Sequence, residues 1–120
     1  VVADGCILEK GVVIESSAIG LRCRIGPGAQ IRNSVLMGAD YYDTSADVQT
    51  HQAAGTPLLG IGSNAVIDGA IIDKNCRIGR GARISNPNGQ TNSDLSDDVF
   101  VRDGVVVVQK DSVIPPHWEM

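Results

Sequence analysis

The chain has 120 residues and a formal net charge of -4, and only 3% of its residues are aromatic. This composition supplies neither the basic surface nor the stacking side chains that bind nucleic acid. The longest run of Ile, Leu and Val, from Val105 to Val108, is too short to span a bilayer. The sequence therefore predicts a soluble protein with one core and with neither nucleic acid nor membrane as a partner.

An apolar residue recurs at every sixth position from the start of the chain, and mostly small residues follow four places later. The ladder consists of Val1, Ile7, Val13, Ile19, Ile25, Ile31 and Met37. A hexad is typical of one short strand plus a corner, and the chain returns above itself after about 18 residues. The pattern predicts an all-β fold, a left-handed parallel β-helix or hexapeptide-repeat solenoid, with the ladder residues pointing inward.

The ladder stops after Met37, and residues 38–60 are longer than most connections in compact domains. Thr44 and Asp47 resemble a capping box, and Gly55 followed by Pro57 is a helix stop signal. The sequence predicts a long inserted loop that contains a short helix.

Two aspartates and two tyrosines precede this predicted helix. We expect Asp40 and Asp43 to cap turns on either side of Tyr41 and Tyr42. The tyrosine rings are expected to pack the insertion onto the coil or into a subunit contact.

The ladder resumes at Ile61, and the second half of the chain divides into a regular and an irregular part. The regular part continues through Ile67, Ile72, Ile78 and Ile84. Residues 85–98 are polar and turn-rich without periodicity, which predicts a loop. Val101, Val107 and Val113 form a looser run that predicts an irregular capping coil. The whole chain is thus predicted to be one domain, with coils at 1–37, 61–84 and 101–114, an insertion at 38–60 and a polar loop at 85–98.

Cysteine usage indicates packing rather than chemistry. Cys6, Cys23 and Cys76 are odd in number and have no CxxC spacing, which fits a reducing compartment better than a disulfide framework. No spacing of Cys, His, Asp or Glu predicts a metal site in this chain.

Two strings carry a resemblance to a known family. SVLMGADYYDT at residues 34–44 and GIGSNAVIDGAIIDKNCRIGRGARI at residues 60–84 closely resemble the C-terminal β-helix domain of ADP-glucose pyrophosphorylase, or glucose-1-phosphate adenylyltransferase. The YY after MGAD is most similar to the small-subunit type of plants, algae and cyanobacteria. The resemblance implies an enzyme that converts ATP and glucose 1-phosphate, with Mg²⁺, into ADP-glucose and pyrophosphate for starch or glycogen synthesis.

In that family the reaction belongs to an N-terminal nucleotide-binding domain with a Gly-rich phosphate loop, and no such loop follows a strand here. The chain also begins within a repeat. We therefore expect the N-terminal catalytic domain to be absent from this chain, and the chain alone to be non-catalytic and without a cofactor. The resemblance implies that Mg²⁺ and ATP bind the catalytic domain, that the parent is a homotetramer or heterotetramer, and that it works in a plastid stroma or a bacterial cytoplasm.

Two lysines match the family's effector lysines. They are Lys74 in IIDKNCRIG and Lys110 in VVVVQKDSVIP. The resemblance implies that both bind phosphate-bearing regulators such as 3-phosphoglycerate and inorganic phosphate, and a lysine ammonium offers three donors to such oxygens. The family pattern is not kept at residues 85–98 and in the closing PPHWEM. Because that loop separates the two lysines along the chain, its altered length can move one relative to the other.

Arg77, Arg80 and Arg83 follow Lys74 at intervals of three. They can extend a positive strip toward an anionic ligand. Outward positions of a β-helix are ordinarily polar, so we interpret these arginines as surface charges.

Two other functions remain open at the level of sequence. Hexapeptide β-helices also form trimeric acyltransferases with a histidine base, for which His51 is the candidate, although we interpret it as an ordinary exposed histidine. The second open alternative is a purely structural assembly module that binds no small molecule. A γ-type carbonic anhydrase is excluded, because it needs three zinc-binding histidines and this chain has only His51 and His117.

Overall fold

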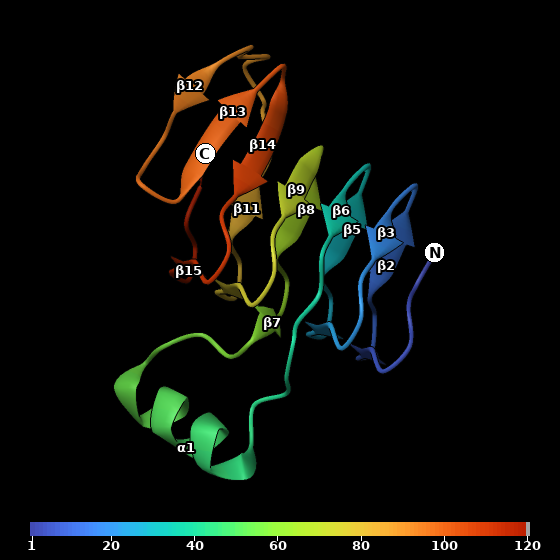
Figure 1. Cartoon of the computed structure of the whole chain (residues 1–120), viewed down its shortest axis with the longest axis vertical. Coiled ribbons are helices and arrows are strands. Elements are labelled where there is room, and N and C mark those ends of the chain that lie inside the picture. The colour runs from blue at the N-terminus through green and yellow to red at the C-terminus, as the bar shows by residue number, and fades with distance from the viewer. Residues whose placement is uncertain (120) are drawn as a thin grey trace.

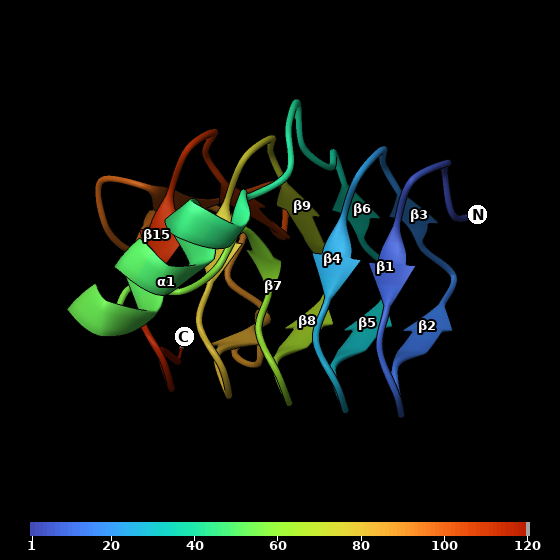
Figure 2. The same cartoon turned by 90° about the horizontal axis from the view of Figure 1, so that it is seen from below.

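The computed structural model describes residues 1–119, which coil into a parallel β-helix with three sheets around one core (Figure 1). Sheet I contains β1 (Ile7–Leu8), β4 (Arg24–Ile25), β7 (Gly60–Ile61), β10 (Arg77–Ile78) and β15 (Val113–Ile114). Sheet II contains β2 (Val13–Glu15), β5 (Gln30–Arg32), β8 (Val66–Asp68) and β11 (Arg83–Ile84). Sheet III contains β3 (Ala18–Ile19), β6 (Val35–Leu36), β9 (Ala70–Ile72), β14 (Val105–Val108), β13 (Val99–Arg102) and β12 (Ser93–Asp94). The first two sheets are parallel throughout, as Figure 2 shows from below.

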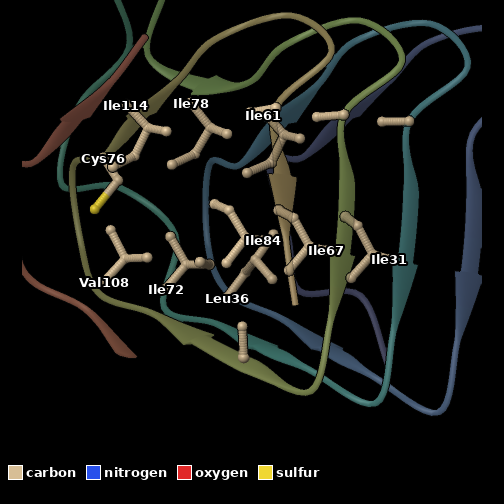
Figure 3. Close-up of a cluster of buried hydrophobic side chains, with 14 of the residues drawn as sticks. Ile31, Leu36, Ile61, Ile67, Ile72, Cys76, Ile78, Ile84, Val108 and Ile114 are labelled. Carbon is tan, nitrogen blue, oxygen red and sulfur yellow. The ribbon is translucent and has the colours of Figure 1, made fainter. Parts of the chain in front are cut away.

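The core is a set of columns, in which the same side-chain position repeats from coil to coil. Ile31, Ile67 and Ile84 form one column and are fully buried, and Figure 3 shows them side by side. Burying an isoleucine contributes roughly 1.5–3 kcal/mol, so successive coils stabilise one another. A second column, Ala29, Ala65 and Ala82, is also fully buried and lies next to a corner, where only a small side chain fits.

The predicted ladder is correct in the middle of the chain and wrong by one residue in the first coil. Leu8, not Ile7, is the equivalent of the inward Ile25. The other corrected inward positions are Ile14, which pairs with Ile31, and Leu36, which pairs with Ile72 and replaces Met37. The reason is that a coil without an interruption has 17 residues, as the separation of Leu8 and Ile25 shows. One of its three steps is shorter than a hexad, so a strict period of six loses register.

The insertion forms the helix that its capping signals predict. Helix α1 spans Ser45–Ala54, and Thr44 is its N-cap in a complete capping box with Asp47. Gly55 ends the helix in the left-handed conformation, with φ of 73°. No residue of α1 is buried, and Figure 1 shows the helix outside the stack of coils. Within residues 1–119, no helix combines the length and the hydrophobicity needed to cross a membrane.

The second interruption is a hairpin rather than only a loop. Strand β12 lies inside the predicted polar loop and pairs antiparallel with β13, which pairs antiparallel with β14. Val99 and Val101 on β13 are fully buried, so the hairpin closes the end of the core. Because β13 reverses direction, Val101 and Val107 are not one column: Val106 and Val108 point inward, whereas Val107 and Val113 do not.

Candidate functional site

The two predicted effector lysines occupy the same position in adjacent coils. Lys74 follows β9 and Lys110 follows β14, and Ile72 pairs with Val108 two residues before them. The backbone N–H of Asp111 donates to the carbonyl of Lys74 at 3.0 Å, which continues the pairing around the corner. Adjacent strands lie about 4.8 Å apart, so the structure brings these lysines side by side across 36 residues of sequence.

A carboxylate from the start of the insertion lies against this pair. The ammonium of Lys74 donates to Asp40 Oδ1 at 3.1 Å. Asn75 Nδ2 donates to Asp40 Oδ2 at 3.1 Å, and Asn75 Oδ1 accepts the backbone N–H of Asp40 at 2.9 Å. Asn75 is buried and its backbone is left-handed, with φ of 61°, which asparagine tolerates well. The side-chain amide of Asn75 therefore holds both the backbone and the carboxylate of Asp40 in place.

The electrostatics of this cluster favour an ionised Asp40. Hydrogen bonds from Asn75 and Lys74 lower the pKa of Asp40, and the charges of Lys74 and Lys110 lower it further. The side chains of Lys74 and Asp40 are 44% and 45% exposed, so an anion from solution can reach them.

We call the corner of the coils that carries Lys74 and Lys110 the lysine corner, and acidic groups outnumber the two ammonium groups there. Asp73 Oδ1 accepts the backbone N–H of Lys74 at 2.7 Å, and Asp111 directly follows Lys110. Together with Asp40 they make the local charge negative. The described residues therefore supply donors for an anion but not the excess positive charge that tight binding requires.

The base of the insertion is fixed by a nearly buried ion pair. The guanidinium of Arg77 donates to both carboxylate oxygens of Asp43, at 2.9 and 2.8 Å, and the side chains are 13% and 8% exposed. The hydrogen bonds from Arg77 lower the pKa of Asp43, and Asp43 raises that of Arg77. Asp43 Oδ2 also accepts the backbone N–H of Leu59 at 3.1 Å, which joins the two ends of the insertion.

The predicted turn-capping role of Asp40 and Asp43 is wrong, because both carboxylates bind side chains of the next coil. Tyr42 ties the insertion to the first coil through its hydroxyl, which donates to the carbonyl of Gly5 at 2.8 Å, but Tyr41 and Tyr42 are both about half exposed, so their rings are not packed into the coil. Arg77 is a structural anchor. The sequence analysis named Asp40 and Arg77 but did not predict that Asp40 binds Lys74 or that Arg77 binds Asp43, and the signal that points to these contacts is the register. Gly38 is equivalent to Lys74, so the insertion leaves the coil beside the lysine corner.

The remaining arginines lie apart from this corner. Arg83 Nε is 3.7 Å from Glu119 Oε1, a weak and exposed contact. Arg80 lines a groove of about 490 Å³ between the insertion and sheet I, together with Gln52 and Pro116. The interpretation of the three arginines as surface charges therefore fits Arg80 and Arg83 but is wrong for Arg77, whose side chain is only 13% exposed, and the three do not form a continuous positive strip.

The other candidate residues do not form a reactive centre. His51 lies in the last turn of α1, within the insertion. Burial raises the pKa of Cys23 to about 12 and that of Cys76 to about 11, so both thiols stay protonated near neutral pH. Among residues 1–119, no three His, Cys, Asp or Glu side chains are grouped so that they can hold a metal ion.

The stacked coils, the corner lysines and the two interruptions can be compared with known families. Residues 1–118 match the family model of the GLGC left-handed parallel beta-helix domain. The chain belongs to this family. Membership in the GLGC β-helix family confirms the left-handed parallel β-helix and the resemblance to the ADP-glucose pyrophosphorylase type of domain.

Proposed function

We propose that the chain is the regulatory and oligomerisation domain of a glucose-1-phosphate adenylyltransferase of the small-subunit type, active in starch or glycogen synthesis. GLGC family membership supports the parent reaction. The observation that carries the regulatory role is the placement of Lys74 and Lys110 in equivalent positions of adjacent coils. Ammonium groups carried by adjacent coils can converge on several oxygens of one phosphate, as in 3-phosphoglycerate or inorganic phosphate.

The acidic neighbours of the lysines support a site that this chain shares with another part of the protein. We place the missing positive charge on the predicted N-terminal catalytic domain, where Mg²⁺ and ATP also bind. This arrangement suits a regulator, because a ligand held by two domains stabilises the conformation in which both domains contact it over the conformation in which they do not. A plastid stroma or a bacterial cytoplasm is the proposed location.

Exposed apolar side chains support the oligomerisation role. Val35 and Ile71 are neighbours on the outer face of sheet III and are 41% and 38% exposed, and Val107 lies beside Ile71. An outward aliphatic row of this kind is typical of an interaction surface. Sedimentation velocity of the full-length protein tests this part, with a tetramer as the expected result.

The effector site is tested in the full-length protein by titrating 3-phosphoglycerate against Lys74→Ala and Lys110→Ala. Each substitution removes charged hydrogen bonds, and we expect the half-activating concentration to rise about tenfold or more. Activity without effector should change little. Lys10→Ala is the matched control, because Lys10 is exposed and is the only other lysine. Normal activation in both test variants would leave only the structural role.

The division of labour between domains has its own test. The 120-residue chain alone should form no ADP-glucose from ATP, Mg²⁺ and glucose 1-phosphate. Detectable turnover by the isolated chain would contradict the assignment of the reaction to another domain.

A further inference from the structure

The corner that carries the two lysines already contains an anion. Asp40 Oδ1 accepts a hydrogen bond from the Lys74 ammonium at 3.1 Å, which is the kind of contact that a phosphate oxygen would make there. Lys110 forms no ion pair with any side chain of residues 1–119, although its charge reaches Asp40. One lysine is therefore occupied by an internal carboxylate, and the other is free to meet a ligand.

Asp40 is held at this position independently of Lys74. The amide of Asn75 bonds both the Asp40 carboxylate and the Asp40 backbone N–H. Five residues of the insertion cover the span from Ala39 to Asp43, and both ends are tied down, by Arg22 Nε to the Ala39 carbonyl at 2.9 Å and by Arg77 to Asp43. Asp40 therefore cannot swing far away, whereas the long Lys74 side chain can.

An incoming phosphate and Asp40 compete for the same ammonium. When phosphate draws the Lys74 ammonium toward itself, the hydrogen bond to Asp40 is weakened or broken, and the carboxylate remains close to a second negative charge. Both effects weaken phosphate binding, and both are absent if the side chain at this position is neutral.

We propose that Asp40 is an internal competitor that sets the anion affinity of the lysine corner. This inference rests on the proposed effector site. In the protein without ligand, the charge of Lys74 is balanced by Asp40. Only a ligand that offers more charge or more contacts than one carboxylate displaces Asp40 from Lys74. Asp40 thereby raises the concentration at which the regulator acts.

The test is the binding of inorganic phosphate to the full-length protein, measured by titration calorimetry. Asp40→Asn has nearly the same shape as the native side chain and keeps an oxygen for Asn75, but it lacks the charge. We expect this variant to bind phosphate about three- to fivefold more tightly, the scale of an exposed ion pair. The matched control is Asp94→Asn, which removes an exposed carboxylate paired with Arg102 at 2.8 Å. It should bind phosphate as the native protein does.

The lysine variants separate failure of this inference from failure of the site. If Lys74→Ala and Lys110→Ala bind phosphate like the native protein, the proposed effector site itself is wrong. If they bind weakly but Asp40→Asn binds no more tightly than the native protein, the site stands and the competitor role is overturned. Weaker binding by Asp40→Asn would show that Asp40 positions the lysines instead.

A double variant identifies the partner of Asp40. If Asp40 acts by occupying Lys74, the gain produced by Asp40→Asn should shrink in a Lys74→Ala background. An undiminished gain in that background would contradict the competition mechanism.

Discussion

Arg77 and Asp43 show how one pair of residues can join two parts of the molecule that differ in burial. Their two hydrogen bonds connect an insertion whose helix buries no residue to strand β10 of a tightly packed coil. Since both side chains are nearly buried, removing one partner leaves a charge without compensation.

Arg77→Met should lower the free energy of unfolding by about 2–3 kcal/mol, because Asp43 loses its charged hydrogen bonds. The measurement is urea denaturation of the chain. Arg102→Met is the control, since Arg102 and Asp94 form an exposed pair, and its cost should be below about 1 kcal/mol. Equal costs for the two substitutions would contradict the anchoring role of Arg77.

The same pair predicts a dependence of stability on pH. Arg77 lowers the pKa of Asp43 from its ordinary value of 3.8, so folding favours the ionised carboxylate. The resulting stability is fully present above pH 3.8 and is lost as the pH falls through the lower folded pKa. Asp43→Asn should be less stable than the native chain at neutral pH, and the difference should shrink in acid. Urea denaturation at a series of pH values checks this, and a constant difference would refute it.

At this scale the sequence singled out the two lysines as candidates, and their role stays a prediction, but it did not indicate their surroundings. Lys74 and Lys110 stand in recognisable strings, whereas Asp40 reaches Lys74, and Asp43 reaches Arg77, only through the path of the insertion. Contacts between side chains more than 30 residues apart, such as Asp40 with Lys74, depend on where a coil closes. A one-residue change in register moves every outward side chain inward.

At the scale of elements, local signals were the more reliable guide. The capping box and Gly55 predicted α1 correctly, because a helix end is determined by neighbouring residues. The short step of each coil displaced the ladder by one residue in the first coil, where Leu8 and Ile14 are the inward residues. Strand β12 was missed because a two-residue strand has no periodicity of its own.

An Ile-Gly pair recurs in three hexads, at residues 25–26, 61–62 and 78–79, and its steric explanation leads to a prediction. A Cβ on Gly62 would lie 2.5 Å from the backbone nitrogen of Arg80 in the next coil. Gly62→Ala should therefore cost about 2–4 kcal/mol in urea denaturation, since two coils must separate. Gly89→Ala is the control: its φ of 63° is strained for alanine, but no atom lies within 4 Å, so about 1 kcal/mol is expected. A smaller cost for Gly62→Ala than for Gly89→Ala would contradict the close approach of the coils.

At the scale of the whole molecule, a solenoid must close its ends. Glu119 forms a parallel β-bridge with Arg83. The residue before it, Trp118, therefore occupies the position that Ala29, Ala65 and Ala82 hold in earlier coils. It is partly buried against the core, where no further coil limits its size.

Trp118→Ala should destabilise the chain by about 2 kcal/mol, less than the full cost of a completely buried aromatic residue. Circular dichroism during urea denaturation is the suitable measurement, because Trp118 is the only tryptophan and fluorescence would lose its signal. Val113→Ala in the same coil is the control, since Val113 is 46% exposed and should cost much less. Equal losses would contradict the closing role of Trp118.

The hairpin that interrupts the last turn leaves the alignment of the coils intact. Leu36 pairs with Ile72, and Ile72 with Val108, at the same separation of 36 residues, although one interval contains a helix and the other a hairpin. After each interruption the chain resumes the strand register of the preceding coil. Contrary to the expectation drawn from the loop at residues 85–98, the segment between Lys74 and Lys110 can therefore vary in length and charge without moving the backbone positions of the two lysines, which the stacked strands hold in register.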